Sequence, residues 1–182
     1  MRLGGRVSYR HYLPLFCGAL ALTALAAARV PAPLQQKDYL TDAESDKIRD
    51  TPSPAARIDL YISFAEDRLK KFEYEIHRPV QEPRRIEILN TLLNGYVGCV
   101  DDAADQIDDA QEKHVDIREA LKSMKSKDQN FLDTLEKYDK PGPDFDDYKD
   151  SLEDAIDGTK DALSDAGDAE KETPAAPVRR KQ

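Results

Sequence analysis

The chain has 182 residues, 35% of them charged, and a formal net charge of −9. A chain this acidic repels the phosphates of nucleic acids, which argues against DNA or RNA binding. Tryptophan is absent and aromatic residues make up 7%, which is more typical of a helical bundle than of a β-sandwich or barrel. The length suits one domain of ordinary small size.

Residues 1–28 have the pattern of a secretory signal peptide. They hold three arginines and no acid, an apolar run covers residues 13–28, and residues 26–28 offer a small-x-small cleavage site. We therefore predict a protein exported to the periplasm or the extracellular space, whose mature chain begins near Arg29 and does not insert into the membrane. An uncleaved N-terminal anchor is the alternative, although the apolar run is shorter than the ~20 residues that span a bilayer.

The segment after the leader is predicted to be a linker and a short helix. Residues 29–40 are rich in proline and glutamine, which predicts a flexible linker. Thr41 and Glu44 have the S/T-x-x-E spacing of a capping box, and Pro52 follows soon after. These signals predict a short helix over residues 41–50.

A long helix is predicted from Ser53 to about His77. Serine followed by proline is a strong helix start, and Pro79 ends the pattern. Its apolar stripe has four- and three-residue spacing and consists of Ile58, Ile62, Ala65, Leu69, Phe72 and Ile76. Since residues 80–83 make a tight connection, the next helix must return antiparallel.

The longest pattern of the chain runs from residue 86 to residue 138. Apolar residues recur there at alternating spacings of three and four, and only His114 and Asp128 interrupt them. The positions are Ile86, Leu89, Leu93, Tyr96, Val100, Ala103, Ile107, Ala110, His114, Ile117, Leu121, Met124, Asp128, Phe131, Leu135 and Tyr138. This pattern predicts a helical seam that is buried against other helices.

The seam allows one long helix or two shorter ones. Asp116 and Glu119 are spaced as a helix cap and the acid three residues later, and Ser126 with Gln129 is a second candidate. We predict a turn at residues 114–116, which sets the helices before and after it side by side. An unbroken helix across this region would instead make a rod.

The last helix follows the Pro-Gly-Pro run of residues 141–143, which ends the preceding helix near Lys140. Asp144 is predicted to cap it, and its apolar side is Phe145, Tyr148, Leu152, Ile156 and Leu163. The apolar side fades before residues 169–182, a tail that we predict to be disordered. The chain is therefore predicted to be all-α: an antiparallel up-down bundle of four main helices preceded by a short helix, with residues 41–168 as the domain.

Small residues mark one turn of the seam. Gly95 and Gly98 each cost roughly 1 kcal/mol of helix stability against alanine. They predict that a neighbouring helix or a bulky side chain comes close there, and a ligand slot is the other interpretation. Cys99, the only cysteine after the leader, is interpreted as a small packing residue, with an intermolecular disulfide as the alternative.

The sequence contains no recognisable catalytic, cofactor or metal-ligand motif. His77 and His114 lack the Glu-x-x-His spacing of di-iron bundles, and we interpret them as a helix C-terminal residue and a residue at the bend. Neither lies in a context that suggests a base beside a nucleophile. We therefore predict that the protein is not an enzyme, and we assign no catalytic, cofactor-binding or metal-binding residue.

Acidic residues are in excess. Five aspartates crowd one predicted helix, namely Asp101, Asp102, Asp105, Asp108 and Asp109, and many more acids follow residue 144. No EF-hand spacing occurs among them. We interpret them as a solvated face that keeps the protein soluble, with weak Ca²⁺ binding or attraction of a basic partner as alternatives.

One helix and part of the seam resemble a known group of domains. The run Arg57-Ile58-Asp59-Leu60-Tyr61-Ile62-Ser63-Phe64-Ala65-Glu66-Asp67-Arg68-Leu69 resembles the opening helix of uncharacterised helical domains of exported bacterial proteins. The pattern of Tyr96, Ala103, Ile107, Ala110 and Asp116-Ile117 is similar to theirs, so the resemblance covers residues 55–138. It implies a helical domain of the cell envelope and carries over no active-site residue, because that family has no assigned chemistry.

These observations lead to one main functional prediction. The protein is expected to be an exported, non-enzymatic helical module with a structural or protein-interaction role in the cell envelope and an unidentified protein partner. The alternative is an envelope chaperone or stress sensor with an acidic, weakly cation-binding surface.

Overall fold

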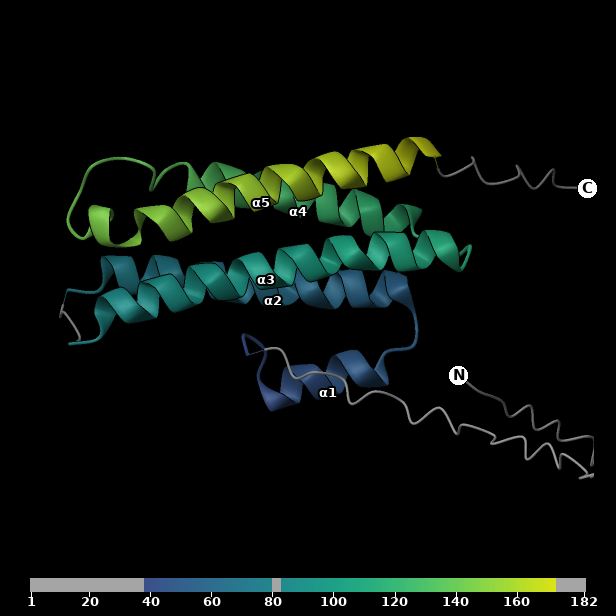
Figure 1. The fold of residues 1–182 in the computed structure, drawn as a ribbon, viewed down its shortest axis with the longest axis horizontal. Helices are drawn as coiled ribbons and strands as arrows, with labels where there is room; N and C mark the ends of the chain where they lie inside the picture. Colours follow the sequence, from purple (N-terminus) through teal and green to yellow (C-terminus); the bar gives the residue numbers. More distant parts are fainter. Residues whose placement is uncertain (1–37, 80–82, 173–182) are drawn as a thin grey trace, which may run out of the picture. The chain divides into compact units, whose positions relative to one another are not determined.

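A computed structural model describes residues 38–79 and 83–172, and the regular structure within them is helical. Five helices follow in order: α1 (Asp42–Asp50), α2 (Pro54–His77), α3 (Arg85–Glu112), α4 (Arg118–Leu135) and α5 (Phe145–Glu172) (Figure 1). The prediction of an all-α bundle of four main helices preceded by a short helix is confirmed. The predicted signal peptide and most of the predicted linker lie outside the described residues.

Two antiparallel hairpins, α2–α3 and α4–α5, stack to form the bundle (Figure 1). α3 packs along α5, and α2 packs along α4, so these two neighbouring pairs run parallel. α3 and α4 are consecutive in sequence but lie on a diagonal of the bundle, and the prediction that they lie side by side is wrong. The five-residue connection between them permits this arrangement, because it reaches roughly 16 Å when extended. That is enough for the diagonal, about 14 Å, of a square of helices about 10 Å apart.

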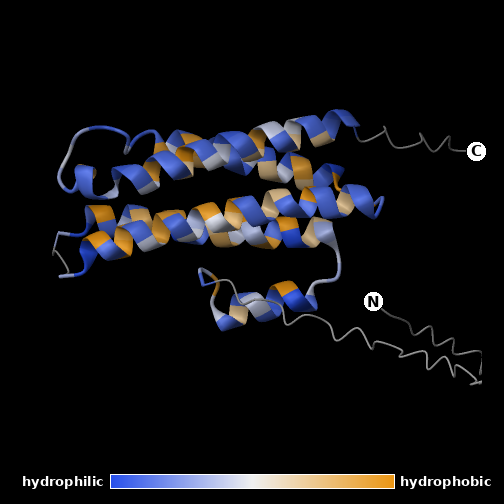
Figure 2. Cartoon of the chain, in the orientation of Figure 1, coloured by the Kyte–Doolittle hydropathy of each residue, from blue (hydrophilic) through white to orange (hydrophobic). Residues whose placement is uncertain are grey.

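The predicted seam forms the core of the bundle. Buried seam residues come from α3 and α4 and include Leu89, Leu93, Tyr96, Val100, Ile107, Leu121, Met124, Phe131 and Leu135. Large rings meet across the diagonals: Tyr96 contacts Phe131 edge to face at 5.8 Å between ring centres, and Phe72 contacts Tyr148 at 5.7 Å. The first seam residue is the clearest exception, because Ile86 is 37% exposed at the start of α3. Figure 2 shows hydrophobic residues recurring along α3 while hydrophilic residues prevail along α5.

Ion pairs join α4 to both of its neighbours, α2 and α5, from the outside. Lys127 on α4 pairs with Glu66 on α2 at 2.9 Å, and Lys125 on α4 pairs with Glu170 on α5 at 2.6 Å. These pairs are partly exposed and contribute modestly, because water screens surface charges. The packing of the seam therefore supplies most of the stability of the bundle.

The predicted turn between α3 and α4 is confirmed. His114 has a φ of 53°, a left-handed conformation that ends α3, and its side chain is exposed. The carboxylate of Asp116 accepts the backbone N–H of Arg118 at 3.2 Å and also pairs with the Arg118 guanidinium, so it satisfies one of the first free donors of α4. Residues 126–129, the second candidate for a break, continue within α4.

Three helix boundaries in the second hairpin differ from the prediction. α4 ends at Leu135, before Lys140, and turns follow it. Asp144 does not take the extended conformation of a helix cap: its φ is 62°, and its carboxylate accepts Nε–H of Arg85 at 3.1 Å. α5 continues past residue 168 to Glu172 because Ala169 is buried, so the first four residues of the predicted disordered tail are helical. Residues 173–182 lie outside the described part.

None of the helices in the described part has the length and apolar character that a membrane-spanning helix requires.

Candidate functional site

The most specific polar contacts of the molecule hold residues 39–44, which we call the clasp, on the surface of α2 and α3. Tyr39 lies against Gly98: a β-carbon built on Gly98 would be 2.7 Å from Cε1 of the Tyr39 ring. The Tyr39 hydroxyl donates a hydrogen bond to the buried carboxylate of Asp102. Glycine is therefore required at residue 98 by the close approach of a bulky side chain, as the sequence predicted.

Arg68 of α2 is the second part of the receiving surface. It is 7% exposed, and its guanidinium donates to both carboxylate oxygens of Glu44, from Nη1 at 2.8 Å and from Nη2 at 2.7 Å. Nη2 also donates to the backbone oxygen of Tyr39 at 2.7 Å, and Nη1 to that of Phe64 at 3.1 Å. A β-carbon on Gly95 would lie 3.4 Å from Nε of Arg68, so the small residue makes room for the guanidinium. We call Arg68, Gly95, Gly98 and Asp102 the clasp groove.

Glu44 has two structural roles in the clasp. Its carboxylate accepts the backbone N–H of Thr41 at 2.9 Å, and the Thr41 hydroxyl accepts the backbone N–H of Glu44 at 3.3 Å. The predicted capping box is thus confirmed. The hydrogen bonds from Arg68, together with those from Thr41, lower the pKa of Glu44 to about 2, so it is ionised at neutral pH. The same pair raises the pKa of Arg68.

The contacts of the clasp correct one part of the linker prediction. The described end of the predicted flexible linker, residues 38–40, is a turn, in which Leu40 is buried and Tyr39 packs on the core. The helix that follows has no fully buried residue, and its partly buried residues are Glu44, Ser45 and Ile48. The attachment of α1 therefore depends on the clasp.

The clasp groove recognises features that belong to a peptide. It offers a guanidinium to a carboxylate and to a main-chain carbonyl, a carboxylate to a phenol, and a glycine surface to an aromatic ring. Sequence reasoning did not find this site, because the residues of the clasp lie 24 to 63 residues from their hydrogen-bond partners in the clasp groove. The two glycines and the capping box were its only local signals.

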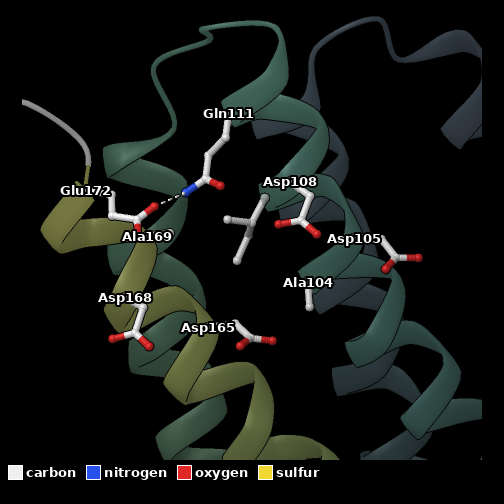
Figure 3. A pocket seen from close by; sticks show the side chains of 9 residues that line it. Ala104, Asp105, Asp108, Gln111, Asp165, Asp168, Ala169 and Glu172 are labelled. Carbon is white, nitrogen blue, oxygen red and sulfur yellow. Dashed lines mark hydrogen bonds between the residues drawn. The ribbon is translucent and has the colours of Figure 1, made fainter.

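A second feature is a groove between the C-terminal halves of α3 and α5, shown in Figure 3. Its volume is about 270 Å³, and we call it the acidic groove. Its lining is Ala104, Asp105, Ile107, Asp108, Gln111, Asp165, Asp168, Ala169 and Glu172. Gln111 donates to Glu172 across it at 3.4 Å, and Lys171 pairs with Asp168 at 2.7 Å. The folded chain thus brings together acids that lie far apart in the sequence, and their field attracts cations.

The acidic groove bears on the prediction of weak Ca²⁺ binding. Calcium takes six to eight oxygen ligands at roughly 2.3–2.6 Å. Within the part of the chain that the structure describes, no three residues of the types His, Cys, Asp and Glu are grouped so that they could hold a metal ion. Weak association of Ca²⁺ with the acidic surface stays a prediction.

Asp128 is the third feature. It lies in the seam on α4, is 0% exposed, and neither carboxylate oxygen has a hydrogen-bond partner among the described residues. Burial raises the pKa of Asp128 to about 7, although the charge of Lys127 acts in the opposite direction. The nearby hydroxyl of Tyr96 is paired elsewhere: it donates to Thr159, which donates to the backbone oxygen of Ala155 at 2.6 Å. The sequence showed this aspartate as a polar interruption of the seam, but not that it lacks a partner.

The remaining residues singled out in the sequence have structural surroundings. His77 is the last residue of α2, and its Nδ1 lies 2.7 Å from the backbone oxygen of Glu73. His114 lies at the bend, as predicted. Cys99 is buried, which favours the interpretation as a packing residue.

Comparison with known proteins adds no relative. The chain matches no family model, and neither the curated proteins nor the solved structures gave a match. The resemblance to helical envelope domains therefore remains a prediction.

Proposed function

We propose that this protein is an exported, non-enzymatic protein-interaction module of the cell envelope. The observation that carries the proposal is the clasp groove, in which Arg68, Gly98 and Asp102 hold a peptide segment by its backbone, its aromatic ring and its carboxylate. Such a combination of a main-chain contact with pockets for particular side chains is how protein modules recognise peptides.

Two further observations support the proposal. The N-terminal basic and apolar pattern favours export, where neither a nucleotide pool nor a reducing buffer is present. The acidic groove supplies a field that selects a basic partner and repels nucleic acids.

The test is a search for a partner with the mature chain, residues 29–182, immobilised and exposed to envelope extract. We expect one protein at a stoichiometric level, and its complex with the mature chain should form again from the two purified proteins. The variant Arg84→Gln changes only an exposed ion pair with Glu87, and it should retain the partner. Turnover of any substrate in a broad panel, in the absence of a complex that can be reconstituted, would contradict the proposal.

The second candidate is an envelope chaperone or stress sensor, and Asp128 is the observation that favours it. A buried carboxylate that has no hydrogen-bond partner among the described residues makes the stability of the core depend on pH, as a sensor of external conditions requires. This candidate predicts that substoichiometric protein suppresses the aggregation of unfolded clients, and that the suppression changes between about pH 4 and pH 7. A pH-independent result would remove the support for the sensor.

A further inference from the structure

The clasp is attached to the bundle by few contacts. Tyr39 and Glu44 bind Arg68, Leu40 is buried, and Ile48 is partly buried, while no residue of α1 is fully buried. The helices α2–α5 pack on one another through the seam, and Leu40 is the one residue of the clasp that is buried in the core they form. Opening the clasp therefore leaves the core in place, and is a local event that costs less than global unfolding.

When the clasp opens, polar groups of the clasp groove lose hydrogen-bond partners. Arg68 loses the carboxylate of Glu44 and the carbonyl of Tyr39, and Asp102 loses the phenol. A buried charge that loses one of its partners is less well stabilised, so the surface gains most from a segment that supplies the same groups again. The required segment has a tyrosine, then a Ser/Thr helix cap two residues later, and a glutamate three residues after the cap.

The surroundings of Tyr39 favour a partner protein over a second copy of this chain. A second copy would make the same contacts that the clasp already makes within its own chain. Nothing would then offset the entropy that is lost on association. Burial raises the pKa of the Tyr39 hydroxyl, and the neighbouring acids Asp101 and Asp105 add to the effect. Asp38 precedes this tyrosine in the chain and adds another negative charge beside the residue on which Asp101 and Asp105 act. A segment with a basic residue at that position is the better complement.

We propose that the clasp is an exchangeable occupant of the clasp groove, and that the second occupant is a partner segment with a basic residue, a tyrosine and a glutamate-capped helix start. This inference rests on the proposed function and specifies the chemistry of the partner. In the closed molecule the clasp competes with the partner for Arg68, Gly98 and Asp102. The closed form is thus self-inhibited.

The experiment uses the full chain and a fluorescent peptide with the sequence of residues 38–51. Tyr39→Ala with Glu44→Gln weakens the clasp and leaves the groove intact. We expect saturable binding of the peptide, measured by fluorescence anisotropy, at least tenfold tighter to this double variant than to the wild-type chain. Adding Gly98→Leu should abolish the binding, because a side chain would occupy the place of the tyrosine ring.

A second peptide tests the basic residue. Asp38→Lys in the peptide should bind the double variant severalfold tighter than the original sequence, and the gain should fall as salt is added. Tyr39→Ala in the peptide should remove the binding. Equal affinities for the lysine and aspartate peptides would overturn the assignment to a basic partner segment.

Three further outcomes of the binding experiments would overturn the proposal. One is a folded double variant, by circular dichroism, that does not bind the peptide, and another is binding that persists with Gly98→Leu. The third is a wild-type dimer that forms with rising concentration and disappears with Gly98→Leu, because the second occupant would then be another copy.

Hydrogen exchange of the wild-type chain is decisive even where the double variant does not fold. The amides of α1 should exchange well before those of α2 and α3, and exchange only through global unfolding would show that the clasp does not open. If the clasp is not replaced by a partner segment, the proposed function can still hold, since a partner recovered by the mature chain could bind elsewhere. The two failures are therefore distinguishable.

Discussion

The guanidinium of Arg68 and the carboxylate of Glu44 form a two-point ion pair, with N–O distances of 2.8 and 2.7 Å, between α2 and α1. Both side chains are largely buried, and Glu44 also caps α1 through Thr41. One carboxylate thus couples the start of a helix to its place on the bundle. Such a planar pair needs arginine, because lysine presents a single ammonium group.

Glu44→Gln should loosen the clasp without unfolding the bundle. A hydrogen bond to a charged group contributes about 1.5–3 kcal/mol. In a hydrogen-exchange measurement, the amides of α1 should therefore exchange roughly ten- to a hundredfold faster than in the wild-type chain. Glu87→Gln, at an exposed pair with Arg84, is the control and should leave α1 unchanged. Unchanged exchange in the Glu44 variant would show that the pair does not hold α1.

Gly98→Ala and Gly167→Ala should have opposite effects. The new methyl group at residue 98 collides with the ring of Tyr39, so α1 should exchange faster. At residue 167 nothing lies within 4 Å of the added carbon, and the variant should be more stable by about 0.5–1 kcal/mol in urea unfolding. Slower exchange of α1 with alanine at residue 98 would contradict the close approach.

Leu93→Ala and Phe131→Ala should each lower the free energy of unfolding by about 2–5 kcal/mol. The reason is that both side chains lie in the core, at 0% and 6% exposure. Asp105→Ala and Asp157→Ala, on exposed positions, should stay within about 0.5 kcal/mol in the same chemical denaturation. Larger losses for the aspartates would instead indicate that a bound cation holds the acids together.

Asp128 should make the folded bundle less stable as pH rises from about 4 to about 7. Burial raises the pKa of Asp128 to about 7, so the folded state keeps the proton in a range where the unfolded state, with a pKa near 4, has released it. The folded state binds more protons, and its free energy of unfolding therefore falls with pH over this window and is constant above it.

Asp128→Asn tests this sign. Urea unfolding at pH 4 and pH 7 should show a smaller loss of stability in the variant than in the wild-type chain, by up to about 4 kcal/mol, the free energy that corresponds to a pKa raised from near 4 to about 7. Asp157→Asn, at an exposed position of α5, is the control and should follow the wild type. Equal pH dependence in all three chains would mean that Asp128 is ionised when folded.

Export should be visible at the N-terminus of the native protein. We expect sequencing of protein purified from cells to begin near Arg29, since residues 26–28 offer the cleavage site. Met1 in a membrane fraction would indicate an uncleaved anchor instead.

The helices could be predicted from the sequence because their signals are local. The 3–4 spacing of residues such as Leu93 and Phe131, the capping box at Thr41 and the prolines at residues 52 and 54 each act within one or two turns. The order of the helices around the bundle could not be predicted. A connection of five residues can join helices that are neighbours on one side of the bundle as well as helices that lie on its diagonal. Asp144 was misjudged because its carboxylate pairs with Arg85, 59 residues away.

The clasp groove was hidden for a related reason. Tyr39 and Asp102 are 63 residues apart, and no periodic pattern links them. Gly98 did show that something bulky comes close, but not which residue does. The character of Asp128 likewise depends on packing, since an aspartate at a seam position is costly only when no donor reaches it.

Both hairpins of the bundle are continuous in sequence, and contacts that are local in sequence form early and fast. Every group of the clasp and its groove, from Tyr39 to Asp102, precedes α4. A chain that emerges N-terminus first therefore completes α1–α3 before α4 and α5 are made. During that interval the core faces of α2 and α3 are bare and prone to aggregate, while the clasp already joins the two helices. We therefore expect the clasp to contribute to productive folding of the nascent chain as well as to the finished bundle.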